Sequence, residues 1–185
     1  MKVLFIVPEI RLDSTPDNMP FWAGILAAIV ENKGGGVGIL DLNVLRMKYD
    51  GRQVPTKVIS EEISSEKWDL IGIGGLTTTY SRIKELCPLI KKCSPDSLLI
   101  AGGGWASYNP DEILQLVPEL DLICIGEGEE TFSELYDEME HGTKDFEKVN
   151  GLCLRDGKGF KFTGPRALIA DLNTVPYPAI HLFET

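Results

Sequence analysis

Residues 70–80 have the sequence Leu-Ile-Gly-Ile-Gly-Gly-Leu-Thr-Thr-Thr-Tyr, a short apolar run followed by a glycine-rich turn. The run Leu70–Ile73 has no polar side chain, which is typical of a strand covered on both faces in a parallel sheet. The next segment, Ser81–Lys92, repeats apolar residues at helical spacing. A strand, a loop and a helix in this order indicate an α/β fold.

The same unit recurs on both sides of this stretch. The expected strands are Val3–Val7, Val37–Leu42, Leu70–Ile73, Ser97–Ala101 and Asp121–Ile125. The expected helices are Phe21–Asn32, Thr56–Glu66, Ser81–Lys92, a segment that begins at Pro110, and Thr131–Glu140. This alternation predicts a doubly wound domain with a parallel, five-stranded sheet.

The character of the chain changes near Val149. Two short apolar segments flank Asp156-Gly157, a favoured hairpin turn, so residues 149–164 are expected to form a small β-hairpin extension of the main domain, residues 1–148. Beyond Gly164-Pro165 the periodicity fades and prolines recur, which predicts an extended linker over residues 165–185.

Composition narrows the possible partners and locations. The chain has 185 residues and a net charge of −10, which disfavours nucleic acid and anionic membrane surfaces as partners. No apolar stretch is long enough for a membrane span, and Val3–Val7 is too short for a secretory signal, so we expect a cytoplasmic protein. The four cysteines show no closely spaced pair, so we expect them to be reduced and structural, and we predict no metal site.

Three of the expected strands end in loops of small residues. Because the carboxyl ends of parallel strands meet at one edge of the sheet, these loops predict a ligand slot there. Glycine lets a ligand approach the backbone closely, and threonine hydroxyls offer hydrogen bonds, although each loop alone is equally compatible with a tight turn. The predicted binding residues are Gly74, Gly75, Leu76, Thr77, Thr78, Gly102, Gly103, Gly104, Trp105, Gly126, Glu127 and Gly128.

Several common ligand sites and catalytic sets are missing from the sequence. The segment Gly126–Thr131 lacks the third glycine of a dinucleotide fingerprint and carries three glutamates where a pyrophosphate would lie. A phosphate-cradling Gly-Lys-Ser/Thr loop is absent. His141 and His181 lie away from the predicted loop ends, so no catalytic residues are assigned.

Three segments together resemble a known cofactor-binding family. They are Asp69–Leu76, the Gly-Glu-Gly-Glu-Glu-Thr-Phe sequence that ends at Phe132, and Asp171–Pro178. The chain resembles, over nearly its whole length, the cobalamin-binding domain that precedes the catalytic barrel of radical S-adenosylmethionine enzymes, either methyltransferases or the anaerobic Mg-protoporphyrin monomethyl ester cyclase. This resemblance implies a flavodoxin-like sheet with the corrin ring over the loop ends and the nucleotide tail of the cofactor beside the third and fourth strands.

The chain departs from related modules in two ways. Related methyltransferase modules carry Asp-x-His-x-x-Gly after the first strand, but residues 9–24 contain no histidine, so the resemblance implies cobalamin without a histidine lower ligand. A Cys-x-x-x-Cys-x-x-Cys motif for a [4Fe–4S] cluster is also absent. We therefore expect the cluster and S-adenosylmethionine to bind in a C-terminal catalytic domain of the same polypeptide, toward which residues 165–185 lead, and we do not expect this segment alone to be catalytic.

Two other functions remain open. The fold could serve as a docking module that has lost its ligand, which predicts an exposed apolar patch around Trp105, or it could bind a flavin or a nucleotide. Phe21 and Trp22 could be core residues or could cover the cofactor. Glu127, Glu129 and Glu130 could complement a helix dipole, or could contact the amide groups of the cofactor or the catalytic domain. If the slot is placed correctly, Gly103→Val should block binding without unfolding the sheet.

Overall fold

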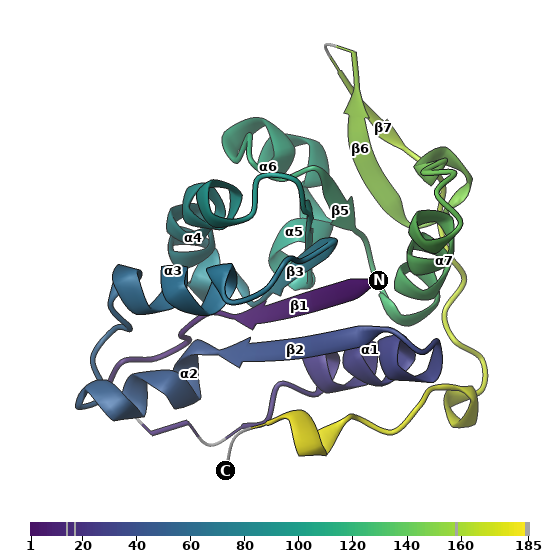
Figure 1. The fold of residues 1–185 in the computed structure, drawn as a ribbon. Coiled ribbons are helices and arrows are strands. Elements are labelled where there is room, and N and C mark those ends of the chain that lie inside the picture. The colour runs from purple at the N-terminus through teal and green to yellow at the C-terminus, as the bar shows by residue number, and fades with distance from the viewer. Residues whose placement is uncertain (14, 17, 158, 184–185) are drawn as a thin grey trace.

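A computed structural model describes residues 1–13, 15–16, 18–157 and 159–183 as a seven-stranded sheet with helices on both faces (Figure 1). The strand order is β2-β1-β3-β4-β5-β6-β7, and the first five strands in this order are parallel. These are β1 (Lys2–Val7), β2 (Gly36–Asp41), β3 (Leu70–Gly74), β4 (Leu98–Gly102) and β5 (Leu122–Cys124).

The prediction of a five-stranded sheet is wrong in its strand count. The hairpin expected at residues 149–164 does form, as β6 (Leu152–Asp156) and β7 (Gly159–Phe162). It pairs antiparallel with β5, so that Leu122 lies opposite Leu154, and it continues the main sheet. The free edge of a short strand such as β5 is a ready template for a further strand, which is why the hairpin adds to the sheet.

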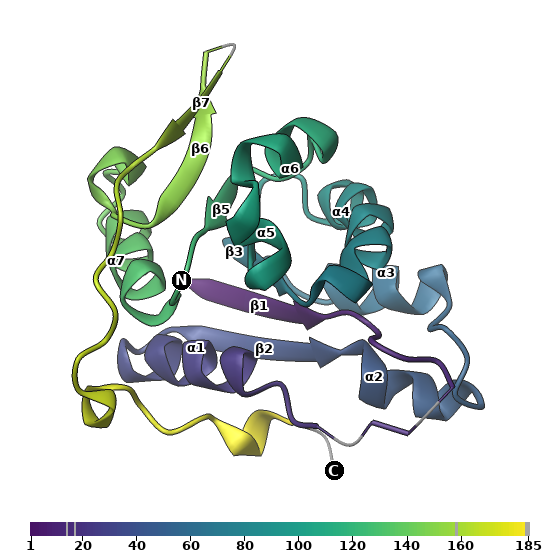
Figure 2. The ribbon, with the colours of Figure 1, turned by 180° about the vertical axis from the view of Figure 1, so that it is seen from behind.

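Two layers of helices cover the sheet (Figure 2). One face contacts α1 (Phe21–Asn32) and α7 (Glu129–Glu140). The opposite face contacts α3 (Thr56–Ser64), α4 (Tyr80–Cys93), α5 (Gly104–Tyr108) and α6 (Pro110–Leu116). Within the part of the chain that the structure describes, no helix is both long and apolar enough to cross a bilayer.

Two short helices were not expected from the sequence. Leu42 begins α2 (Leu42–Leu45) instead of ending a strand, because the Asp41 side chain accepts a hydrogen bond from the Asn43 amide, 2.8 Å away, and caps the helix. The other is α5, which begins directly after Gly103, whose φ of +94° turns the chain sharply at the end of β4.

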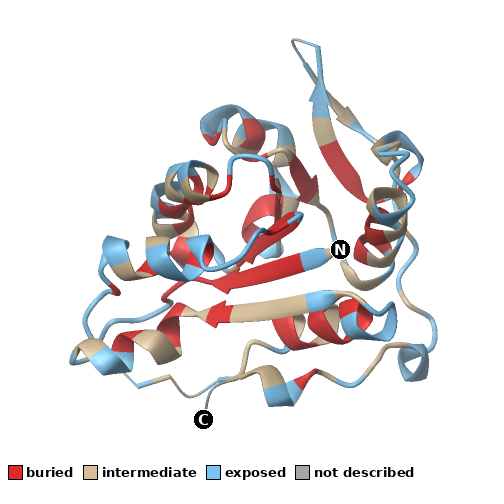
Figure 3. Ribbon diagram, viewed as in Figure 1, coloured by how far each residue is buried: buried red, intermediate tan, exposed pale blue. Residues whose placement is uncertain are grey.

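Side chains on successive residues of β3 enter two separate cores. Ile71 and Ile73 belong to the core on the α3/α4 face, whereas Leu70 belongs to the core on the α1/α7 face. Figure 3 shows that β1 is buried after its exposed first residue, and β3 is buried along its whole length. This is the expected environment of a parallel sheet covered on both sides.

The segment 165–183 forms no strand but is held against the domain. Two single-turn helices interrupt it, η4 (Leu172–Thr174) and η5 (Ile180–Leu182). The Ala179 amide donates to the Gly24 carbonyl oxygen of α1 over 2.9 Å, and a Cβ on Gly24 would lie 2.9 Å from Cβ of Pro178. The tail therefore depends on a glycine in α1 for its close approach.

Candidate functional site

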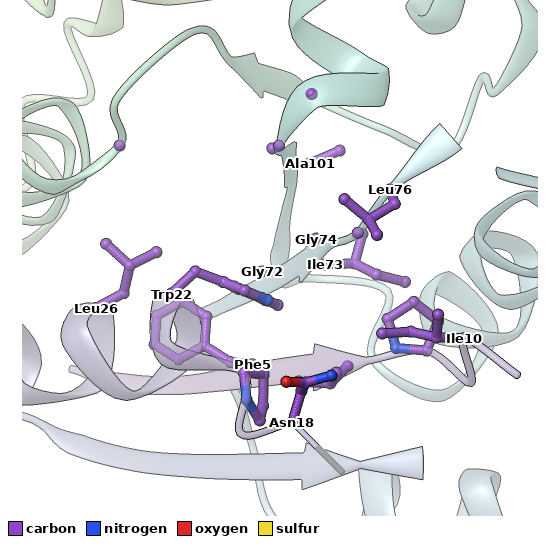
Figure 4. Close-up of a pocket in the computed structure, with 18 of the residues that line it drawn as sticks. Phe5, Ile10, Asn18, Trp22, Leu26, Gly72, Ile73, Gly74, Leu76 and Ala101 are labelled. Carbon is purple, nitrogen blue, oxygen red and sulfur yellow. The ribbon is translucent and has the colours of Figure 1, made fainter. Parts of the chain in front are cut away.

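A cavity of about 550 Å³ opens at the carboxyl ends of β1, β3, β4 and β5, between α1 and α7. Its floor is formed by Phe5, Gly72 and Ile100, which are neighbours across three adjacent strands. Trp22 extends from α1 toward Gly72 and Gly74, as Figure 4 shows. The floor and walls are mainly apolar, and the volume is that of a typical small-molecule site.

Some of the glycines in this region are required by the fold itself. A Cβ on Gly72 would lie 2.8 Å from the Phe5 ring, and a Cβ on Gly75 would lie 2.2 Å from the Thr79 hydroxyl. Gly103 has φ of +94°, and its Cβ would lie 2.6 Å from the Gly75 carbonyl oxygen. Gly103→Val would therefore strain the backbone as well as fill the slot, so a loss of binding in this variant would not by itself locate the cofactor tail.

Three other glycines line the cavity although the fold does not require them. A Cβ on Gly102 would meet its nearest atoms at 3.8 Å, one on Gly128 at 3.6 Å, and one on Gly104 would have no atom within 4 Å. None of the three has a positive φ. A Cβ at these positions would meet no atom closer than an ordinary van der Waals contact, so the packing of the protein does not account for the three glycines.

Comparison with known proteins assigns the fold to a family. A family model described as the B12 binding domain matches residues 10–136, which is most of the chain. The chain belongs to the B12-binding domain family. The match includes β3, β4 and β5 and the three glycine-rich loops that follow them.

Curated relatives of this B12-binding domain are longer proteins. The anaerobic magnesium-protoporphyrin IX monomethyl ester cyclase of Synechocystis sp. is 31% identical over 56% of this chain and 21% of its own length. The cytidylyl-2-hydroxyethylphosphonate methyltransferase of Streptomyces wedmorensis is 26% identical over 99% of this chain and 40% of its own length. The chain thus spans less than half of either relative.

Solved structures with the same fold include two radical S-adenosylmethionine enzymes. The B12-binding domain matches OxsB, solved with aqua-cobalamin and S-adenosylmethionine, with a TM-score of 0.80 at 20% identity, covering 97% of this chain and 24% of OxsB. It matches TsrM from Kitasatospora setae, solved with cobalamin and a [4Fe-4S] cluster, with a TM-score of 0.74 at 19% identity, covering 95% of this chain and 31% of TsrM.

The structure brings most of the predicted binding residues of this B12-binding domain together at the cavity. Those that line it are Gly74, Gly75, Leu76, Gly102, Gly103, Gly104, Gly126, Glu127 and Gly128. Thr77 and Thr78 are exposed in the short helical turn after β3 and lie outside the cavity lining. Trp105 is buried in the core of the opposite face, with its ring 5.6 Å from that of Tyr80.

The deeper lining residues of the B12-binding domain were missed from the sequence. They are Phe5, Leu26, Gly72, Ile100, Cys124 and Phe132, whereas Glu129, one of the three glutamates whose role the sequence leaves open, also lines the cavity. The available signal was Gly72, because a glycine inside a strand often marks a place where something approaches the backbone closely. Of the two aromatic residues left open, Trp22 lines the cavity, whereas Phe21 is exposed.

The mouth of the cavity in this B12-binding domain is held by fixed polar contacts. The Glu9 carboxylate is 2% exposed and accepts two hydrogen bonds from Arg82 of α4, at 2.8 and 3.1 Å. Asn43 donates to the Pro8 carbonyl oxygen and accepts from the Ile10 amide, 2.8 Å away. These contacts fix the loop after β1, which forms one wall of the cavity.

Cys124 and Glu129 are two of the ionisable groups that line the cavity of the B12-binding domain. Burial raises the pKa of the Cys124 thiol to about 12, and the nearby negative charge of Glu129 adds to the rise, so the thiol is neutral near pH 7. Oε2 of Glu129 is excluded from solvent, and no described residue donates a hydrogen bond to it. The remaining lining of the cavity is mainly small and apolar, and Arg11, Asn18, Asn43 and Arg46 add polar groups to it.

Proposed function

We propose that this B12-binding domain holds cobalamin with the corrin ring over the carboxyl ends of its strands and the nucleotide tail in the cavity. The single observation that carries the proposal is the set of open glycines, Gly102, Gly104 and Gly128, at a cavity between α1 and α7. The order β2-β1-β3-β4-β5 of the five parallel strands supports a flavodoxin-like platform for the ring.

The residues of the chain fit the two parts of such a cofactor. The three open glycines leave room for the tail, and Phe5, Ile100 and Phe132 give it an apolar surface from which water is excluded. Bound cobalamin would supply a cobalt centre that carries a methyl group or transfers electrons. The protein's own contribution is to bind the cofactor, orient it and shield it.

We infer that no histidine of this chain ligates cobalt. Among the described residues that line the cavity there is no histidine. His141 follows the last turn of α7, and His181 contacts Glu31 of α1 at 2.8 Å. We expect the nucleotide tail of the bound cofactor to lie in the cavity, away from the cobalt, and no histidine side chain to ligate the cobalt in its place.

We infer that the chain is one part of a larger radical S-adenosylmethionine enzyme, a methyltransferase or a cyclase. The names and lengths of the relatives support this inference. The cluster and S-adenosylmethionine would then bind in another domain, reached through residues 165–185, and substrate choice and catalysis would depend on that domain. The alternative of a docking module that has lost its ligand is less well supported, because Trp105 is only 6% exposed and the cavity is open.

Cofactor uptake by the purified chain tests the proposal. Protein incubated with hydroxocobalamin and separated from free cofactor by gel filtration should retain about one corrin per chain, measured by absorbance. After reduction to the Co(II) form, the electron paramagnetic resonance spectrum should lack nitrogen superhyperfine splitting. Protein that retains no corrin would refute the cofactor assignment, and nitrogen splitting would refute the absence of an imidazole ligand.

A further inference from the structure

Glu129 is the first residue of α7 and lines the cavity. Its Oε2 atom is shielded from solvent, and none of the residues that the structure describes donates a hydrogen bond to it. A buried carboxylate oxygen without a donor is costly, because it has lost its hydration and gained nothing in return. This atom therefore needs an explanation outside the contacts of the protein itself.

The two neighbouring glutamates have partners within the chain, and this distinguishes them from Glu129. Glu127 accepts a hydrogen bond from the Ile169 amide of the tail at 2.7 Å. Glu130 pairs with Arg166 at 3.2 Å and does not line the cavity. The three glutamates of the Gly-Glu-Gly-Glu-Glu sequence thus have different environments: Glu127 and Glu129 both line the cavity, and the unsatisfied oxygen belongs to Glu129.

The cation that pairs with the neighbouring Glu130 is already engaged. The Arg166 guanidinium pairs with Glu130 and Glu134 and donates to the Thr131 hydroxyl at 2.9 Å. On the α7 side the cavity is lined by Gly128, Glu129 and Phe132, and Cys124 lines it at the end of β5. An acceptor on such a wall favours a ligand group that carries an N–H or an O–H, and it repels an anionic group such as a phosphate.

We propose that Glu129 positions bound cobalamin by accepting a hydrogen bond from an N–H or O–H donor of the cofactor. This inference rests on the proposed function. The donor is either a carboxamide N–H of the corrin side chains or a ribose hydroxyl of the tail. The same carboxylate keeps the phosphate of the tail away from the α7 side of the cavity.

The test compares corrinoid affinity in three variants. Glu129→Leu removes the acceptor, Glu129→Gln removes the charge at constant size, and Glu130→Gln makes the same change of charge one residue away, outside the cavity. Titration with hydroxocobalamin, followed by quenching of tryptophan fluorescence, should show about 10- to 100-fold weaker binding for Glu129→Leu. Glu129→Gln should be intermediate, and Glu130→Gln should stay within about twofold of wild type.

A second readout is independent of binding. Without cofactor, Glu129→Leu should be at least as resistant to urea as wild type, because it removes an unsatisfied buried charge. A residue with a purely structural role would instead lose stability when replaced. Weaker binding together with unchanged or higher stability of the free protein therefore supports the proposal.

Cobinamide, which has the corrin carboxamides but no nucleotide, separates the two sources of the donor. If a carboxamide is the donor, Glu129→Leu weakens cobinamide and cobalamin by the same factor. If a ribose hydroxyl is the donor, only cobalamin is affected. Wild-type protein that binds cobalamin with an affinity that Glu129→Leu leaves unchanged would overturn this inference alone, whereas wild-type protein that binds neither corrinoid would overturn the proposed function as well.

Discussion

The two faces of the sheet differ near its carboxyl edge. On the α3/α4 face the core continues to the end of the strands, where Trp105 and Tyr80 close it. On the α1/α7 face, the cavity opens beside Phe5 and Ile100, and Gly102 and Gly128 at its edge leave space that no neighbouring atom fills. One face is filled for stability, whereas the other gives up packing to make room for a ligand.

This difference arises within single strands. Ile71 and Gly72 are adjacent in β3 but face opposite sides of the sheet, because successive strand residues alternate in direction. A face that lacks side chains contributes less hydrophobic stabilisation. We therefore expect substitutions on the filled face to affect stability, and substitutions beside the cavity to affect cofactor binding.

Ile71→Ala should have the largest effect on stability. Ile71 is fully buried on the filled face, and truncation of such a residue costs about 2–5 kcal/mol. Ile100→Ala on the cavity floor should cost less, because part of the Ile100 side chain borders the cavity and not other core residues, but it should weaken cobalamin binding. Urea unfolding of both variants measures the difference, and equal losses of unfolding free energy would contradict the contrast between the faces.

Gly103→Ala should have the next largest effect on stability and should lower the free energy of unfolding by about 1–3 kcal/mol. The new Cβ would meet the Gly75 carbonyl oxygen at 2.6 Å, in a backbone conformation that L side chains rarely adopt. Gly104→Ala is the matched control, because its Cβ would have no atom within 4 Å. Thermal unfolding should show a melting temperature several degrees lower for Gly103→Ala and one near that of wild type for Gly104→Ala. Similar melting temperatures for the two variants would show that the close approach of Gly103 to the Gly75 carbonyl oxygen does not limit which residue position 103 tolerates.

The sequence predicted the α/β alternation well where apolar runs and helical stripes are local features. The runs Leu70–Ile73 and Val3–Val7 lie within β3 and β1, and Phe21–Asn32 matches the bounds of α1. The pairing of β6 with β5 could not be predicted in the same way, because it depends on contacts between segments far apart in the chain. The apolar pattern predicts that Leu42 ends a strand, because the pattern does not show that the Asp41 side chain caps a helix at this point.

The same limit explains what was missed in the site. The mouth of the cavity consists of loop glycines, whose composition is visible in the sequence. Its floor consists of Phe5 and Ile100, which look like ordinary core residues, because a continuous apolar run does not show which face borders an open space. Trp105 looks like a loop residue, but the unexpected helix α5 carries it into the filled core. Glu129 differs from Glu130 only through their partners in three dimensions.

Gly102→Val should leave stability within about 1 kcal/mol of wild type, because its Cβ meets no atom closer than 3.8 Å and its φ is not positive. Its methyl groups would fill part of the space proposed for the cofactor tail. Cobalamin affinity should fall at least about 100-fold, which corresponds to about 2.7 kcal/mol.

Gly36→Val, at the amino end of β2 and outside the cavity, is the matched control for Gly102→Val. It makes the same replacement in a strand of the same sheet and should retain wild-type affinity. Equilibrium dialysis against hydroxocobalamin measures both variants. Wild-type affinity in folded Gly102→Val protein would mean that the tail lies elsewhere.

The reactivity of Cys124 gives a comparison that needs no destabilising substitution. Burial raises the pKa of both Cys124 and Cys87 to about 12, but only Cys124 lines the cavity, whereas Cys87 lies in the filled core. Because the thiolate is the reactive form and the raised pKa keeps both thiols protonated, alkylation of Cys124 at pH 8 should be more than about 100-fold slower than that of a free cysteine. The rate should rise about tenfold per pH unit up to pH 10, and bound cobalamin should suppress it. Cys87 should remain unmodified with or without cofactor. If peptide mass spectrometry finds that Cys124 also remains unmodified, the cavity gives reagents no access to the α1/α7 face.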